Sequence, residues 1–440
     1  MRADIWIRGA RSAVMLDEHG ATAENVDIVI ADGRIAAIGP DLSGSTQSAA
    51  REIDGSNLLV LPGLVNLHTH LPMTLLRGVA ENVTLQGFLE RVWAEEARLM
   101  SPQGAHIGAR LGALEALLGG TTTTLDMYFH PSAVHRGAVD VGLRHVIGPV
   151  FFSFPGPDGL SWDERMSLAR EWPSELQRIG GPHVPPALMP HAAFTVGVDH
   201  LREVAALATH QGALVHTHAS ENDQENRDTI ASTGMRPVAA LAAAGLLGSP
   251  LVLGHGVRLE SQEVAQLAAA ATAIAHCPGS NLKLASGAAD IVGYRAAGVR
   301  VGLGTDGCSS SNDLDMFAVM RLAANLARLV HMDPAAIAAR DVVAMATIDG
   351  ARSLGLADRI GTLEVGKEAD LVLVRTDQPH LVPLHDPYTA LVFSAGRSDV
   401  THVLVAGELV IDDRRATRVD ANEIMASAMA HVNGTPDSLA

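Results

Sequence analysis

Apolar and polar residues alternate differently in the middle of the chain than at its two ends. Residues 1–57 contain short segments of alternating apolar and polar positions between turn residues, a pattern typical of antiparallel strands. From Leu58 to about residue 360, short runs that are apolar throughout alternate with longer segments whose apolar positions recur at helical spacing. After Lys367 the strand-like alternation returns. The pattern predicts a central region of strands and helices flanked by two β-rich ends.

Eight apolar runs predict the strands of one parallel sheet: 58–68, 121–129, 144–152, 186–194, 213–219, 250–257, 272–277 and 300–307. Strands that are apolar on both faces and alternate with helices form parallel sheets covered on both sides. Eight such strands are the number that closes a (β/α)8 barrel. We therefore expect an α/β protein with a barrel domain over residues 58–360 and a composite β domain built from residues 1–57 and 361–440. We expect the last residues of the tail to be mobile.

Composition and charge exclude several classes of protein. The chain has 440 residues, with 32 Lys or Arg against 49 Asp or Glu, and its net charge of −17 offers little to a phosphate backbone. Its two cysteines exclude a disulfide framework and a four-cysteine zinc site. We therefore expect no nucleic acid among its partners.

Two segments bear on targeting and membranes. The first ten residues lack the apolar run of a signal peptide. The uncharged stretch 237–254 is interrupted at residues 248–250 by Gly-Ser-Pro, which predicts a buried helix, a turn and a buried strand rather than a membrane span. We expect a cytoplasmic protein that does not bind a membrane.

Five side chains able to bind a metal or carry a proton fall at the ends of predicted barrel strands. His68 and His70 close the first strand, where the two-residue period places both on one face, and His218, His255 and Asp306 end the fifth, sixth and eighth strands. Active sites of (β/α)8 barrels lie at this carboxyl rim. Imidazole and carboxylate ligands without a thiolate suit zinc or iron(II), either of which would lower the pKa of a bound water toward ~7. The sequence therefore predicts a metal centre at the rim.

The positions of these residues predict separate roles. Asp306 can act both as a ligand and as the base that takes a proton from the attacking water. Glu221 follows His218 by three residues and can carry that proton to the substrate. We expect His255 to hydrogen-bond the attacking hydroxyl rather than bind the metal. His216 shares a face with His218 but lies one level deeper in the strand, so we interpret it as structural.

The lysine content bears on the number of metal ions. Barrel hydrolases with two metals commonly bridge them with a carboxylated lysine at the end of the fourth strand. Here that strand has no lysine, because the chain contains only Lys283, after the seventh strand, and Lys367, beyond the barrel. The other zinc deaminase pattern, H-x-E with P-C-x-x-C, is also absent. We therefore expect one divalent metal per chain.

Seven segments carry longer motifs: PGLVNLHTHLPMTLLRG (62–78), MPHAAFTVG (189–197), HTHASEN (216–222), LGHGVRL (253–259), HCPGSNLKLASG (276–287), GLGTDGCSSSNDLDMF (302–317) and IGTLEVGKEADLVLV (360–374). They resemble the amidohydrolase superfamily and, more narrowly, its methylthioadenosine/S-adenosylhomocysteine deaminase branch. The resemblance implies a distorted (β/α)8 barrel with a small β-sandwich from both chain ends. It also implies zinc or iron bound by His68, His70, His218 and Asp306, with Glu221 and His255 at the attacking water.

The same resemblance implies contacts with a substrate. By motif, His191 and Ser310 approach the sugar or the base, and Glu96 accepts hydrogen bonds from ribose hydroxyls, although its neighbour Glu95 could equally take that role. Phe88 stands where this branch commonly has tryptophan and could stack on a purine ring.

The leading hypothesis is hydrolytic deamination of an adenine nucleoside at C6, releasing ammonia and the inosine analogue. Branch members that act on S-adenosylhomocysteine need cations for its carboxylate, and segment 148–162, where we would look for them, has no arginine or lysine. This favours substrates of 5′-methylthioadenosine or adenosine type, with a neutral 5′ group.

Two alternatives are weighed against this hypothesis. The enzyme could act on another nitrogen heterocycle, namely guanine, a pterin, cytosine or a triazine. A metal-binding protein without catalysis would be expected to lack Glu221 or Asp306, and both are present. The sequence leaves the oligomeric state open, a homo-oligomer included.

Overall fold

The two ends of the chain build one mostly antiparallel sheet. The computed structural model describes residues 2–46 and 48–434, so the end of the tail, which we expect to be mobile, lies outside the described residues. The sheet has nine strands in the order β18-β17-β16-β15-β5-β1-β2-β3, with β4 paired to β1. Its strands are β1 (Arg2–Val14), β2 (Thr22–Ala31), β3 (Arg34–Gly39), β4 (Ser48–Asp54), β5 (Leu58–Pro62), β15 (Leu371–Arg375), β16 (Val400–Val405), β17 (Glu408–Asp412) and β18 (Arg415–Ala416).

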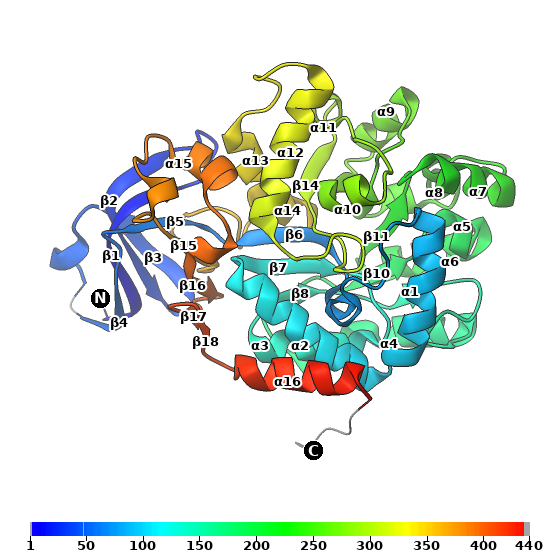
Figure 1. Ribbon diagram of the computed structural model, residues 1–440, viewed down its shortest axis with the longest axis horizontal. Helices are drawn as coiled ribbons and strands as arrows, with labels where there is room; N and C mark the ends of the chain where they lie inside the picture. Colours follow the sequence, from blue (N-terminus) through cyan, green and yellow to red (C-terminus); the bar gives the residue numbers. More distant parts are fainter. Residues whose placement is uncertain (1, 47, 435–440) are drawn as a thin grey trace.

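The middle of the chain forms a barrel of parallel strands (Figure 1). Its strands are β6 (Leu64–Thr69), β7 (Thr121–Asp126), β8 (Arg144–Val146), β9 (Val150–Phe151), β10 (Ala187–Pro190), β11 (Leu214–Ala219), β12 (Leu251–His255), β13 (Ala273–His276) and β14 (Arg300–Leu303). They pair as a six-stranded sheet from β14 to β9 and a three-stranded sheet from β6 to β8. A hydrogen bond of 2.9 Å from the Asp306 N–H to the His68 carbonyl links the last strand to the first. The predicted α/β fold class is confirmed.

Two of the predicted barrel strands are each divided in two. The run 58–68 contains β5, which pairs with β1 and β15 in the sheet of the chain ends, and β6, which begins the barrel. The run 144–152 contains β8, paired with β7, and β9, paired with β10. The first division falls at Pro62-Gly63 and the second at Gly148-Pro149. Proline has no N–H to donate to a neighbouring strand, so it interrupts the pairing of a continuous strand. The pairing therefore assigns Leu58–Pro62 to the sheet of the chain ends.

Helices cover the outside of the barrel (Figure 1). The longer ones are α1 (Leu85–Leu99), α2 (Pro102–Leu118), α3 (Pro131–Val141), α4 (Trp162–Ile179), α6 (Val198–Gln211), α7 (Asp223–Thr233), α9 (Ser261–Ala269), α12 (Met316–His331) and α16 (Ala421–Val432). Shorter α-helices are α5 (Ala193–Val196), α8 (Pro237–Ala243), α10 (Pro278–Lys283), α11 (Ile291–Ala296), α13 (Ala339–Met345), α14 (Ile348–Ser353) and α15 (Pro387–Thr389). Short 3-10 helices are η1 (Leu42–Gly44), η2 (Leu71–Leu76), η3 (Leu246–Gly248), η4 (Pro379–Leu381) and η6 (Arg397–Asp399), and η5 (Ala390–Ser394) is a short π-helix.

Helix α2 shows how local sequence sets these boundaries. The helix begins at Pro102, and the hydroxyl of the preceding Ser101 accepts a hydrogen bond of 3.2 Å from the Gly104 N–H. It ends at Leu118 and is followed by the glycine pair 119–120, of which Gly120 has φ of 86°, in the left-handed region that favours glycine after a helix. The C-terminal helix α16 returns to pack against α2, where Arg110 forms an ion pair with Glu423.

The stretch 223–248 is, by length and composition alone, apolar enough to be considered as a membrane span. The structure divides it into α7, α8 and η3, and Gly234 between the first two lies in the left-handed region with φ of 74°. Residues 237–254 form a helix, a turn and strand β12, as the sequence predicts.

Candidate metal centre and active site

Strand β6 and the residue after it position the first two histidines of the site. His68 lies in β6 and is completely buried, and His70 follows the strand as the residue that begins η2. The strand closing the barrel passes close to His68, because a Cβ added to Gly304 would lie 2.9 Å from the Cβ of His68. A glycine at 304 therefore allows β6 and the end of β14 to approach each other.

Unusual backbone geometry places the other strand-end residues. His255 and Asp306 have φ of 72° and 62°, in the left-handed region that non-glycine residues seldom adopt. Ser220, just before Glu221, has φ of 54°. Such strained residues gather at functional sites, where the surrounding structure holds them in place. The chain turns sharply at each of these strand ends, beside the cavity described below.

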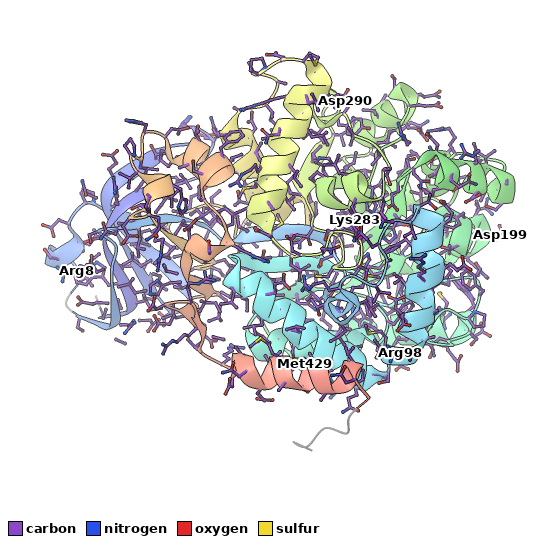
Figure 2. All side chains as sticks on the ribbon, viewed as in Figure 1. Arg8, Arg98, Asp199, Lys283, Asp290 and Met429 are labelled. Atoms are coloured by element: carbon purple, nitrogen blue, oxygen red, sulfur yellow. The ribbon has the colours of Figure 1, made fainter. Side chains whose placement is uncertain are left out.

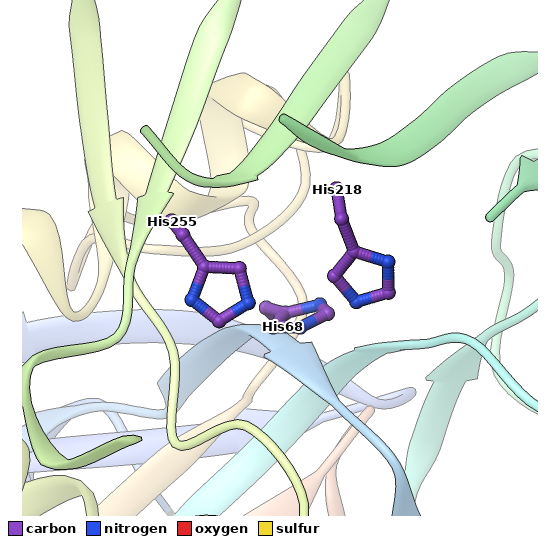
Figure 3. Close-up of side chains that lie close together, drawn as sticks. All are labelled: His68, His218 and His255. Carbon is purple, nitrogen blue, oxygen red and sulfur yellow. The ribbon is translucent and has the colours of Figure 1, made fainter. Parts of the chain in front are cut away.

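The predicted metal ligands converge on one point. The Nε2 atoms of His68 and His70 lie 3.4 and 3.2 Å from Asp306 Oδ1. His68, His70 and Asp306 form one group of donor atoms within 4.8 Å of one another, and His68, His218 and His255 form a second (Figure 3). The two groups share His68, and together they contain the four predicted ligands and His255, which we expect at the attacking water rather than on the metal.

The donor atoms suit a divalent metal. His68 Nε2 is buried and has no hydrogen-bond partner. The Nδ1 atoms of His70 and His218 lie 2.6 and 2.8 Å from the carbonyls of Met127 and His191, and because a carbonyl only accepts, both Nδ1 atoms must carry the proton. Their Nε2 atoms are thus free to bind a metal.

The electrostatics favour the same arrangement. Burial lowers the pKa of His68 to about 4 and the pKa of His218 well below its usual value, which keeps both rings neutral. Burial acts to raise the pKa of Asp306, but the neighbouring imidazole rings of His68 and His70 outweigh burial and hold the pKa of this carboxyl well below its usual range. At His70, burial acts to lower the pKa, but the Asp306 carboxylate outweighs it and raises the pKa to about 9, so binding of a metal to His70 Nε2 would release a proton. Neutral imidazoles and an ionised carboxylate are the forms that bind a metal.

Glu221 and His255 face each other next to this cluster. His255 Nε2 lies 3.7 Å from Glu221 Oε2 and 4.0 Å from Asp306 Oδ2, while its Nδ1 lies 2.9 Å from Asn281 Oδ1. Burial raises the pKa of Glu221, so this carboxyl holds a proton more readily than an exposed one. A proton carrier needs this property.

A cavity opens beside the cluster. Its lining includes His70, His218, Glu221, His255 and Asp306 at one end, together with Met73, Leu85, Phe88, Leu89, Val92, Trp93, Glu96, Met127, Tyr128, Phe129, Val150, Phe152, His191, Ala192, Phe194, Glu225 and Leu284. The cavity therefore joins the metal cluster to a largely apolar and aromatic space.

The structure distinguishes Glu96 from Glu95. Glu96 is 2% exposed and lines the cavity, and its Oε1 has no hydrogen-bond partner. Glu95 does not line the cavity and forms an ion pair of 2.7 Å with Arg98, which is labelled in Figure 2. Glu96 is the residue available to a ligand in the cavity.

The other predicted substrate contacts fall in two groups. Phe88 and His191 line the cavity, and His191 stacks on Phe152 with ring centroids 4.7 Å apart. Ser310 is buried and does not belong to the lining; its hydroxyl donates to Asp306 Oδ2 at 2.8 Å. A substrate contact of Ser310 stays a prediction, while its hydrogen bond holds the carboxylate of Asp306, a predicted metal ligand.

The sequence reasoning did not identify several residues of the site. Glu225 accepts a hydrogen bond of 2.6 Å from the Glu221 N–H, and burial raises its pKa to about 7. Its position four residues after Glu221, on the first turns of a helix, is a signal that could have found it. Trp93 lies on the same helix as Phe88 and Glu96, and Phe152 directly follows β9, so strand-end reasoning could have found Phe152 as well.

The cavity lining contains no arginine or lysine among the described residues. Arg165 lies behind it, over the Phe152 ring, but it is 1% exposed and both terminal nitrogens bind Asp158, at 2.5 and 2.9 Å. Lys283 reaches the Ser309 carbonyl and Glu81 instead of the metal cluster. Each of these cations is thus held by groups of the protein itself.

Comparisons with known proteins agree on one family. The model described as "Amidohydrolase family" matches residues 59–410. The 5-methylthioadenosine/S-adenosylhomocysteine deaminase of Moorella thermoacetica is 41% identical over 402 residues, covering 91% of this chain and 92% of that protein. An adenosine deaminase from Xanthomonas campestris, solved with bound zinc, is 35% identical with a TM-score of 0.94 over 98% of each chain. The atrazine chlorohydrolase of Arthrobacter aurescens, complexed with zinc, is 28% identical with a TM-score of 0.89 over 97% of this chain and 100% of that one.

Proposed function

The chain belongs to the amidohydrolase family, and on that premise we propose that it is a zinc-dependent hydrolase that deaminates an adenine nucleoside with a neutral 5′ group. One observation carries the proposal. A single cavity is lined by donors of the cluster, by Glu221 and His255, and by aromatic side chains together with the buried carboxylate of Glu96, whose Oε1 has no hydrogen-bond partner.

The metal is assigned from the donors and from the relatives. His68, His70, His218 and Asp306 would hold one ion, and the two solved relatives named above contain zinc. When bound, a divalent metal supplies Lewis-acid chemistry that lowers the pKa of water toward ~7.

The residues of the chain supply the proton transfers. Asp306 Oδ2 accepts from Ser310 and faces His255 Nε2, so this oxygen is oriented to accept a proton from attacking water. Glu221, with its raised pKa, delivers a proton to the ring nitrogen next to C6 as the water oxygen bonds to C6. The proton accepted by Asp306 then passes to the C6 amino group, the C6–N bond breaks and ammonia leaves, while the C6 hydroxyl gives its proton to Glu221 and becomes the carbonyl. Glu225 fixes the backbone that carries Glu221, since it accepts from the Glu221 N–H.

The cavity walls support the choice of substrate. The Phe88 ring and the stacked pair of Phe152 and His191 can pack against a purine, and the carboxylate of Glu96 can accept from ribose hydroxyls. A carboxylate on the 5′ group would meet no free cation there, because Arg165 is neutralised by Asp158.

A substrate panel tests the proposal. We expect 5′-methylthioadenosine or adenosine to be deaminated with a kcat/KM roughly 30- to 150-fold above that of S-adenosylhomocysteine, because a buried carboxylate without a cation forfeits about 2–3 kcal/mol. The measurement is ammonia release from each nucleoside and from guanine, a pterin, cytosine and a triazine. Equal turnover of S-adenosylhomocysteine would refute the neutral 5′ group. Ammonia from another heterocycle, with none from any adenine nucleoside, would establish the alternative instead.

A further inference from the structure

His216 connects one metal-binding histidine to the backbone. Its Nδ1 lies 3.0 Å from the Val252 carbonyl on the neighbouring strand β12, and its Nε2 lies 2.7 Å from Nδ1 of His68. Both rings are completely buried. Water is therefore excluded from this chain of hydrogen bonds.

The direction of both hydrogen bonds follows from the carbonyl. The Val252 oxygen can only accept, so the proton of neutral His216 lies on Nδ1 and its Nε2 is an acceptor. The partner of that acceptor, His68 Nδ1, must then donate. A neutral His68 has no second proton, which leaves its Nε2, the atom without a partner, bare.

The other two histidine ligands are oriented differently. His70 and His218 donate from Nδ1 to backbone carbonyls, of Met127 and His191. These acceptors belong to the main chain and no substitution removes them. His68 alone among the three depends on a side chain for its acceptor.

We propose that His216 is a positioning residue, which holds His68 in the tautomer with a proton on Nδ1 and so presents a bare Nε2 to the divalent metal. This inference rests on the metal site of the proposed function. His216 is not itself a ligand, because its Nε2 accepts from His68. Partners of this kind contribute roughly 10- to 100-fold to metal affinity.

Two substitutions of similar size separate the two hydrogen bonds of His216. In His216→Gln, an oxygen at the ε position can still accept from His68 Nδ1. In His216→Asn, the amide at the δ position can still donate to Val252, but nothing reaches His68. We expect His216→Asn to weaken zinc binding about 10- to 100-fold. The zinc affinity of His216→Gln should stay within a few-fold of that of the unsubstituted protein.

The measurement is zinc affinity by competition with a chelator, with the melting temperature of each metal-free protein as the measure of structural damage. Equal zinc affinity of all three proteins would overturn the inference, as would equal weakening by both substitutions. Failure of the unchanged protein to bind zinc would instead refute the metal assignment in the proposed function.

A measurement on the unsubstituted protein covers the case in which a variant does not fold. Nitrogen-15 spectra of the metal-free, histidine-labelled chain distinguish a protonated Nδ1 from a protonated Nε2. We expect His68, assigned by the signal lost in His68→Gln, to carry its proton on Nδ1. A proton on Nε2 of His68 would overturn the inference.

Discussion

Two buried charged clusters lie at opposite ends of the barrel, and they are built differently. Arg144 begins β8 at the amino end of the strands, and its guanidinium binds Glu368 at 2.6 Å and Asp370 at 2.9 and 3.2 Å. It also donates to the His183 carbonyl at 2.8 Å. Each guanidinium nitrogen of Arg144 has a partner, and the cluster joins the barrel to the residues entering β15.

The metal centre at the carboxyl ends of the strands leaves polar atoms without partners. His68 Nε2, Glu96 Oε1 and Glu225 Oε1 are buried and make no hydrogen bond. Glu96 and Glu225 line the cavity, so their unpaired oxygens are available to a ligand there. The charged groups at the amino end of the barrel bind one another and so stabilise the fold. Those at the carboxyl end are available to bind a metal and a substrate.

The largest expected effect is the loss of metal and activity when the cluster at the carboxyl ends of the strands is disrupted. Asp306→Asn keeps the shape of the side chain but removes the ionised ligand and proton acceptor, so we expect loss of bound metal and of deaminase activity below detection. Metal analysis of the purified protein and ammonia release measure the two effects. If the variant kept both its metal and its activity, Asp306 would not be a metal ligand.

Glu221→Gln separates proton transfer from metal binding. The substitution leaves the four proposed ligands in place, so metal content should be unchanged while kcat falls about 10²- to 10⁴-fold. Near-normal turnover would show that another group carries the proton. Glu95→Gln, on the surface of α1, is the matched control and should change neither quantity.

Arg144→Met instead removes the guanidinium from the charged cluster at the amino ends of the strands. It leaves Asp370 buried without its cation, while Glu368 keeps its ion pair with Arg359, and we expect the free energy of unfolding to fall by about 3–5 kcal/mol. Activity per folded molecule should be unchanged, because the metal centre lies at the other end of the strands. Urea unfolding measures the first quantity, and kcat per bound metal measures the second.

The control for Arg144 is an exposed pair. Arg202 binds Asp199 on the surface of α6, where Asp199 is visible at the edge of the molecule (Figure 2). Arg202→Met should cost under about 1 kcal/mol. An equal loss from both substitutions would contradict the special contribution of the Arg144 cluster.

The smallest expected effect concerns Glu96. Burial raises the pKa of this carboxyl to about 7, so it loses its charge as the pH falls below neutrality. The KM for adenosine should rise by up to about 10-fold between about pH 8 and pH 6, since the ionised form is the stronger acceptor for ribose hydroxyls. Glu96→Gln should abolish this dependence, and 2′,3′-dideoxyadenosine should lack it in the unsubstituted protein. If KM for adenosine depended on pH in the same way in Glu96→Gln and in the unsubstituted protein, Glu96 would not bind the ribose.

Much of the fold could be predicted from the sequence because its determinants are local. The two-residue and helical periods separate the barrel from the β-rich ends, and His68, His218 and Asp306 stand where apolar runs stop. In a parallel barrel all strand ends meet at one rim, so position along the chain implies proximity in space. The division of 58–68 into β5 and β6 was not expected, because strand pairing, which assigns a run to one sheet or another, is a long-range property.

The sequence by itself determined the barrel, the flanking sheet and the types of side chain at the rim, since these follow from periodicity and from the ends of apolar runs. Only the tertiary structure decided that Glu96 rather than Glu95 faces the cavity, that Asp158 neutralises Arg165, and that His216 reaches His68 from a strand 148 residues away. Those three outcomes depend on helix rotation, loop path and inter-strand register. Helix rotation and inter-strand register are set by packing between distant segments, which no local pattern encodes, whereas the Asp158–Arg165 pair depends on the path of the loop just before α4.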